Sequence, residues 1–131
     1  MLCFQSSNVT SKFDLLRVKV QAIDFIKSLK FDKGVLEKLA NLVYELTKEL
    51  VLEQPDACIY INIYRLERKK GLEINVLTTQ MTVEKVLAVL KNNSALAKKG
   101  IYPDKSAGFL DTFDLNPEKS GSMLHIIKLL R

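Results

Sequence analysis

The side chains that most often carry catalytic or metal-binding chemistry are scarce in this sequence. It contains one histidine, His125, and two cysteines, Cys3 and Cys58. No Ser-His-Asp or Cys-His arrangement can be placed from their spacing, and with one histidine and no paired cysteines we expect no structural metal. His125 alternates with Met123 and Ile127, so we interpret it as a structural strand residue, and Cys58 as a small buried apolar residue.

A second group of residues favours binding over catalysis. The sequence from 58 to 66 alternates between isoleucines and the polar residues Tyr60, Asn62 and Tyr64, and the next run alternates in the same way with Glu73 and Asn75. Successive strand residues point to opposite faces, so these side chains share the face that is not covered. Tyrosines on such a face suit a protein interface, and an ordinary solvated sheet face is the alternative.

One dense basic cluster occupies residues 65–70, in a chain of net charge +5. It lies between the two strand patterns, so we predict a hairpin connected around Lys69, Lys70 and Gly71. A basic patch is also typical of nucleic-acid binding, but no recognition motif with interleaved aromatic residues accompanies it. Nucleic acid is therefore the less favoured partner, and a solvated hairpin tip is the simpler interpretation.

Amphipathic helices must position these strands. Ser11 and Asp14 form a capping-box pattern, in which the serine oxygen accepts from the Asp14 amide and the carboxylate reaches back. Apolar residues then recur at helical spacing until about Lys30. Asp32 can cap a second helix, which ends before Pro55 because proline cannot continue the hydrogen-bond ladder.

The remaining patterns complete a predicted α+β fold. Residues 2–9 suggest a short first strand, Thr82 can cap a third helix, and residues 109–115 form a short strand or helix end. A turn at 116–121 precedes a closing strand at 123–130. The order strand-helix-helix-strand-strand-helix-strand-strand predicts a two-layer sandwich, with a mixed or antiparallel sheet and helices on one face.

Length and composition exclude several classes of protein. The 131 residues are 47% hydrophobic and 27% charged, an ordinary balance for a single domain over residues 1–131. No apolar run reaches the roughly 18–20 residues that cross a bilayer. The first residues show no basic region followed by an apolar stretch. We therefore expect no membrane association and a cytoplasmic location.

Three segments carry a resemblance to a known family. They are residues 20–31 (VQAIDFIKSLKF), 38–49 (KLANLVYELTKE) and 120–130 (SGSMLHIIKLL). They resemble, in order, the first helix, the N-box helix and the final strand of the histidine-kinase-like (GHKL or Bergerat) ATPase fold, in its anti-sigma factor serine kinase, or switch-kinase, branch. The predicted order of elements also looks like that fold.

The resemblance implies a nucleotide site, which this sequence matches only in part. Glu45 matches the N-box glutamate that positions or activates the attacking water in the family. It is interpreted equally well as a partly exposed helix residue that pairs with Lys48. The N-box asparagine, which holds magnesium in the family, is replaced by Glu49. A carboxylate can bind Mg²⁺, but its negative charge opposes binding of the triphosphate.

The adenine motif and the glycine-rich lid of the family are altered further. Where the family has D-x-G-x-G, this chain has Thr78 and Thr79, and either Thr78 or Thr79 is only a weak substitute acceptor for the adenine amino group. In the lid region Pro103 lacks the N–H that would donate to a phosphate. Lys105 could attract an anion there by charge alone. No G-x-G occurs anywhere in the chain.

We therefore expect a non-catalytic regulatory interaction protein that resembles an anti-sigma factor. The resemblance implies a regulatory partner, such as a sigma factor or a STAS-domain antagonist, and a degenerate nucleotide site without cofactor. Two alternatives stay open. One is an active ATP-dependent serine kinase or ATPase of the same family, which would use ATP and magnesium. The other is a basic nucleic-acid-binding module. A homodimer is also left open.

Overall fold

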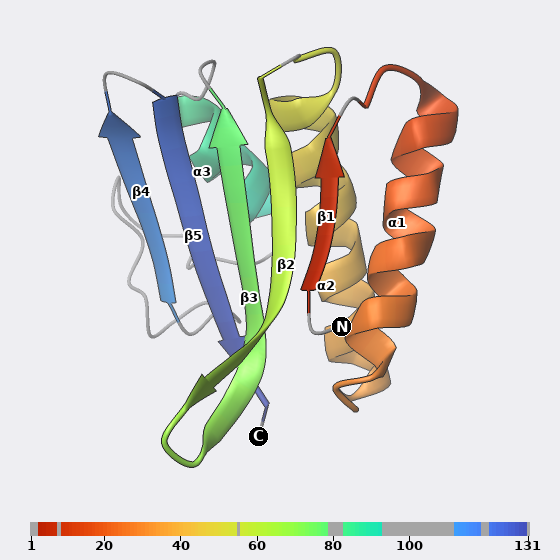
Figure 1. The fold of residues 1–131 in the computed structure, drawn as a ribbon, viewed down its shortest axis with the longest axis vertical. Helices are drawn as coiled ribbons and strands as arrows, with labels where there is room; N and C mark the ends of the chain where they lie inside the picture. The colour runs from red at the N-terminus through yellow and green to blue at the C-terminus, as the bar shows by residue number, and fades with distance from the viewer. Residues whose placement is uncertain are drawn as a thin grey trace.

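The structure of the chain is a computed structural model, which describes residues 3–7, 9–54, 56–78, 83–92, 112–118 and 121–130. Its elements follow the predicted order (Figure 1). They are β1 (Cys3–Ser7), α1 (Lys12–Lys27), α2 (Lys33–Leu46), a π-helical turn (Thr47–Val51), β2 (Cys58–Leu66), β3 (Lys69–Thr78), α3 (Val83–Asn92), β4 (Thr112–Glu118) and β5 (Gly121–Leu129).

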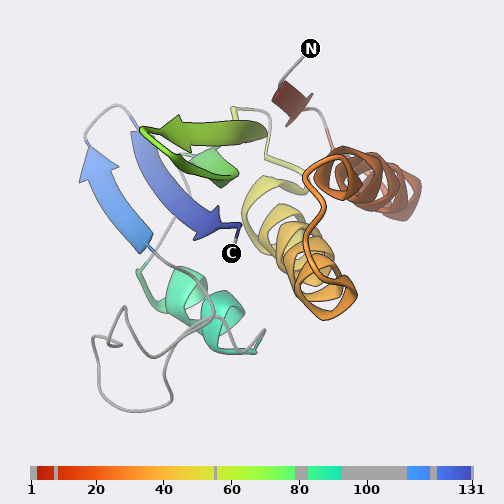
Figure 2. The ribbon, with the colours of Figure 1, turned by 90° about the horizontal axis from the view of Figure 1, so that it is seen from below.

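The five strands of the described residues form one sheet in the order β1-β2-β3-β5-β4, and every neighbouring pair is antiparallel. β5 is the last strand in the sequence but lies between β3 and β4 (Figure 1). The helices lie on one side of the sheet, with α1 packed against α2 at the β1 edge (Figure 2). The predicted α+β fold with helices on one face is therefore confirmed, and the described strands make the sheet antiparallel.

The face of the sheet toward the helices is apolar, because the strand residues alternate. The register pairs Ile61 of β2 with Ile74 of β3, and Ile74 with Ile126 of β5. All three side chains are at most 1% exposed. Helix residues such as Val18 and Leu42 are equally buried and belong to the same core. Each such side chain stabilises the fold by about 1.5–3 kcal/mol, so this layer holds the domain together.

The first turn of α1 is closed by hydrogen bonds that the sequence predicted in part. The Ser11 hydroxyl accepts from the Asp14 amide at 3.2 Å, as expected of a capping box. The Asp14 carboxylate accepts instead from Thr10, at 3.0 Å from its backbone N–H and 3.1 Å from its hydroxyl. These bonds, the backbone one foremost, lower the pKa of Asp14 from its ordinary value of 3.8.

The second helix meets expectation at its C-terminal end but not in its N-cap. Asp32 takes the N-cap position, but its side chain makes no capping hydrogen bond, so the predicted cap is wrong in that detail. At the other end α2 passes into a π-helical turn, where the Leu52 amide donates to the carbonyl of Thr47 at 2.8 Å. The buried Thr47 hydroxyl donates to the Val43 carbonyl at 2.7 Å. The helical segment ends before Glu53, whose φ is 61°.

The predicted hairpin between β2 and β3 is present, but its turn lies earlier than expected. Glu67 and Arg68 form the turn, and Glu67 has a φ of 56°. Residues 69–71 already belong to β3. At Gly71 an added Cβ would lie 2.3 Å from the Lys128 carbonyl oxygen. Glycine therefore allows β5 to pack closely where the hairpin projects beyond the rest of the sheet (Figure 1).

The C-terminal hairpin also corrects a predicted turn. The sequence placed a turn at residues 116–121, whereas β4 continues to Glu118 and β5 begins at Gly121. Pro117 fits because β4 is an edge strand, where a missing N–H costs little. The predicted cap at Thr82 lies outside the described residues.

Among the described helices, none has the length and apolar character needed to cross a membrane.

Candidate interaction surface

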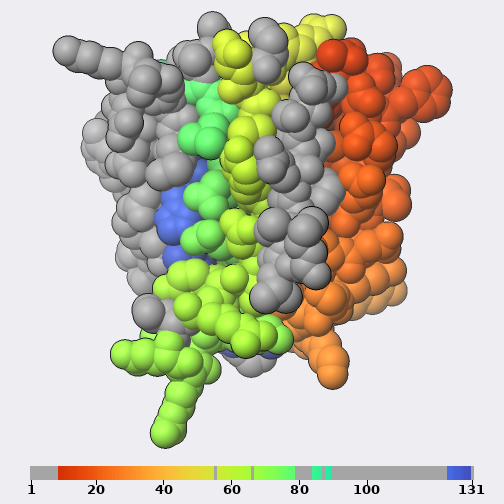
Figure 3. Space-filling model, viewed as in Figure 1, coloured from red at the N-terminus to blue at the C-terminus, as the bar shows by residue number. Residues whose placement is uncertain are grey.

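The outer face of the sheet carries the polar residues that the sequence predicted to lie together. Tyr60, Asn62 and Tyr64 are half-buried and alternate along β2 with the fully buried Ile59 and Ile61. Figure 3 views the molecule from this face, where atoms of β2, β3 and β5 reach the surface. Side chains of these three strands are therefore available to a partner.

Glu73 connects the three strands that form this face. Its Oε1 accepts a hydrogen bond from Asn62 Nδ2 on β2 at 3.3 Å. Its Oε2 lies 2.8 Å from His125 Nε2 on β5. The side chains of Glu73 and His125 are each 26% exposed. Because one carboxylate is engaged from both neighbouring strands, the polar side chains are held in a fixed arrangement before any partner binds.

Tyr60 extends the polar row toward β1. It lies opposite Asn75 in the register, and Asn75 lies opposite His125. The hydrogen bond between the Tyr60 hydroxyl and the thiol of Cys58, with a smaller effect of charge on Cys58, raises the pKa of Tyr60. Cys58 is half-buried on this face, where the sequence predicted a buried apolar residue.

Two of the residues implied by the family resemblance lie in the helical layer, not in the sheet. Glu45 is half-buried in α2, and Glu49 is exposed in the π-helical turn that follows. Thr79 and Lys105 lie outside the described residues. Within the part of the chain that is described, no three His, Cys, Asp or Glu side chains are grouped closely enough to hold a metal ion.

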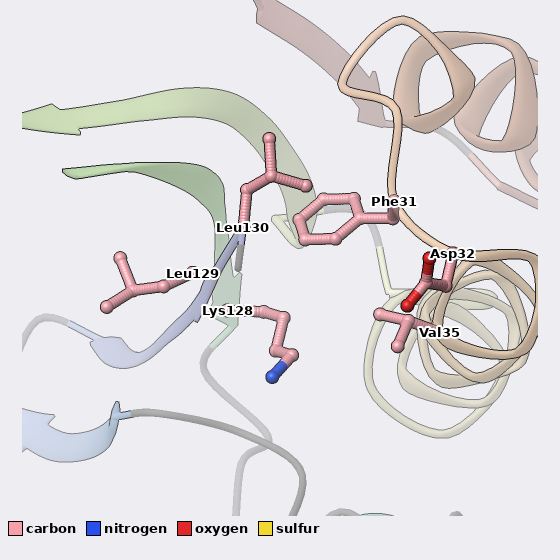
Figure 4. A pocket seen from close by; sticks show the side chains of 6 residues that line it. All are labelled: Phe31, Asp32, Val35, Lys128, Leu129 and Leu130. Atoms are coloured by element: carbon pink, nitrogen blue, oxygen red, sulfur yellow. The ribbon is translucent and has the colours of Figure 1, made fainter.

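A pocket lies at the N-terminal end of α2 (Figure 4). Its volume is about 160 Å³, and ligand pockets usually span about 300–1,000 Å³. It is lined by Phe31, Asp32, Val35, Lys128, Leu129 and Leu130. At about 1.5 Å per residue, Val35 lies roughly 15 Å along the helix from Glu45. This pocket is therefore neither large enough for a nucleotide nor adjacent to the glutamate that the resemblance singles out.

The hairpin of β2 and β3 presents the basic cluster to solvent. Arg65, Arg68 and Lys69 are exposed, together with Glu67, and Lys70 is half-buried. The cluster lies at the end of the same strands that carry the outer polar face. It gives one end of that face a positive charge.

No protein-family model matches this chain, and no curated protein shows a significant match to it.

Proposed function

We propose that this protein is a non-catalytic regulatory binding protein that resembles an anti-sigma factor, and that it binds a regulatory protein through the outer face of its sheet. The observation that carries the proposal is the Glu73 cluster, in which side chains of three strands are fixed by hydrogen bonds on the uncovered face. Interfaces gain affinity from such preorganised groups, because less side-chain entropy is lost on binding. Tyrosines beside them supply the large amphipathic contacts that interfaces favour.

The partner class follows from the resemblance. The helices and strands follow one another in the order that the sequence predicted, and that predicted order was part of the resemblance. The resemblance implies a sigma factor or a STAS-domain antagonist as partner. The exposed position of Glu49 and its negative charge favour a site that does not hold a magnesium nucleotide. A cytoplasmic location belongs to the same proposal.

Binding measurements with purified proteins test this function. The probes are sigma factors and STAS-domain proteins of the source organism, titrated by calorimetry against the wild type and the double variant Tyr60→Ala/Tyr64→Ala. We expect at least one probe to bind, and the double variant to bind it at least tenfold more weakly. Glu37→Ala, at an exposed position on α2, is the matched control and should bind normally. Equal binding by the double variant would refute the outer face as the interface.

The enzyme alternative has its own test. Calorimetry with Mg-ATP should show no binding if the site is degenerate. Micromolar affinity, or phosphate release that disappears in Glu45→Ala, would establish the kinase or ATPase alternative in place of a non-catalytic protein.

The exposed basic hairpin favours nucleic-acid binding as a second candidate function. Phosphate contacts make binding fall steeply with salt concentration. If this candidate is right, DNA or RNA binding should show such a dependence. The slope should shrink when Arg68, Lys69 and Lys70 are replaced by glutamine.

A further inference from the structure

Helix α1 exposes a row of large apolar side chains, which we call the α1 stripe: Phe13, Leu16 and Val20. They are 84%, 54% and 58% exposed, respectively. Of the residues whose side-chain burial the structure describes, only Leu77, at 36%, is another exposed large hydrophobic side chain. Within that set, three of the four exposed large hydrophobic side chains lie on α1.

The stripe is separate from the face by which α1 joins the core. The core face consists of Leu15, Val18, Ala22 and Ile26, all buried. The stripe residues follow at steps of three and four, so they also share a face of the helix. α1 therefore has two apolar faces, one packed against the domain and one in solvent. Standard side-chain areas give the second face on the order of 350 Å², the size of patch that is often functional in monomers.

The first turn of α1, which carries Phe13, is closed by hydrogen bonds. The first turn is fixed by the Ser11 hydroxyl and by the Asp14 carboxylate, which accepts twice from Thr10. Arg17 Nη2 also lies 3.5 Å from Asp14 Oδ1. Phe13 stands inside this closed turn, so a partner would meet it on a preformed helix.

Charge on α1 indicates the occupant. The helix carries four basic and two acidic side chains, a net charge of +2: Lys12, Arg17, Lys19 and Lys27 against Asp14 and Asp24. Lys12 lies four residues before Leu16, and Lys19 lies three residues after it. Both are therefore neighbours of Leu16 on the helix surface, so one border of the stripe is basic. Lys19 also lies over the ring of Tyr44, 5.3 Å from its centroid, on the α2 side. Two copies of α1 in contact would bring net positive surfaces together, which opposes self-association.

We infer that the α1 stripe docks an amphipathic helix of a partner protein whose apolar face is bordered by acidic residues. Apolar residues at helical spacing suit recognition of a helix, and the basic border selects an acidic one. We rest this inference on the proposed role as a regulatory binding protein, to which it adds the chemistry of one partner segment and a second contact surface.

Two matched peptides test the docking surface. Both are 18-residue amphipathic helices with leucines at helical spacing, bordered by glutamates in one and by lysines in the other. Fluorescence anisotropy should show the glutamate peptide binding the full chain at least tenfold more tightly than the lysine peptide. The triple variant Phe13→Ser/Leu16→Ser/Val20→Ser should bind it at least tenfold more weakly. Gln21→Ser, an exposed polar position on the same helix, is the control and should bind as the wild type does.

Three results would overturn the inference. In the first, the glutamate peptide does not bind up to millimolar concentration. In the second, the triple variant binds the peptide as the wild type does while its circular dichroism is unchanged. In the third, the wild type sediments as a dimer and the triple variant does not. The last would make a second copy of the chain the occupant. Failure of this inference can be distinguished from failure of the proposed function. Tyr60 and Tyr64 lie on the sheet and not on α1, so Tyr60→Ala/Tyr64→Ala should leave peptide binding unchanged. Peptide binding that is intact when every regulatory probe fails would refute the proposed function alone.

Discussion

The two faces of the sheet are built from the same strands but differ in burial and polarity. On the inner face Ile61 and Ile74 are sealed beneath the helices. On the outer face their neighbours Asn62 and Glu73 are half-buried and joined by a hydrogen bond. Because side chains alternate along a strand, residues that stabilise the core and residues of the proposed interface lie one position apart. Substitutions one residue apart should therefore have distinct effects.

The largest expected effect comes from the inner face. Ile61→Ala should lower the free energy of unfolding by about 2–5 kcal/mol, because it removes a fully buried side chain and leaves a cavity. Asn62→Ala, one residue later on the outer face, should cost less than about 1.5 kcal/mol. Urea denaturation of both variants measures the contrast, and equal losses would break the division between the faces.

Gly71 should give the next effect, because it is paired with Leu129 at the end of β5. In Gly71→Ala the new Cβ meets backbone atoms of Lys128 and Leu129, at 2.3 and 2.8 Å. We expect a loss of about 1–3 kcal/mol in unfolding free energy. Gly34→Ala is the matched control, since Gly34 is exposed in α2 and the new Cβ would have no neighbouring atom within 4 Å apart from the adjacent residues and the backbone of its own helix. It should stabilise the fold by about 0.4–1 kcal/mol.

A smaller effect is expected for the outer cluster. Glu73→Ala removes the acceptor of Asn62 and the partner of His125, but water can reach both groups. The unfolding free energy should therefore fall by only about 0.5–1.5 kcal/mol. The side-chain NMR resonances of His125 should shift in Glu73→Ala. Asn75→Ala is the control, and it should leave the contact between His125 and Glu73 in place. A loss above about 3 kcal/mol would mean that Glu73 supports the core instead of the surface.

The smallest effect concerns pH and the first turn of α1. The pKa of Asp14 is lowered in the folded state by its bonds from Thr10. Its stabilising contribution is therefore present above the ordinary carboxyl pKa of 3.8, and it is lost as the pH falls through the lower folded value. Asp14→Asn should make thermal stability less dependent on pH in this acidic range. Asp24→Asn, exposed on the same helix, is the control, and an identical response of the two variants would contradict the assignment.

Sequence patterns predicted the fold well because each element carries its own local signal. Alternation around Tyr60 and helical spacing around Leu39 are visible in short windows, so the order of elements and the polar outer face followed from them. The turn at Glu67–Arg68 was misplaced because the basic run continues into β3 without a change in composition. The pairing of Leu66 with Lys69, which fixes the position of the turn, is seen only in the strand register of the structure.

The contacts that define the candidate surfaces depended on information that local patterns lack. Glu73 and His125 are 52 residues apart, and their bond exists only because β5 inserts next to β3. A lone histidine in a strand gives no signal of that partner. The α1 stripe was missed because only the apolar residues of the core face were followed, and Leu16 and Val20 fall outside that face. A search for two separate apolar faces at helical spacing would have found it.

The position of β5 also has a consequence for biosynthesis. β3 and β4 are both made before β5, yet neither has its native neighbour on that side until β5 emerges from the ribosome and enters between them. Until then the edge of β3 that pairs with β5 in the native sheet has unpaired N–H and C=O groups. Such an edge, on a strand with apolar residues such as Ile74, is a template for aggregation. A nascent chain that stops before residue 121 should therefore depend on chaperones and fail to accumulate as a smaller folded protein.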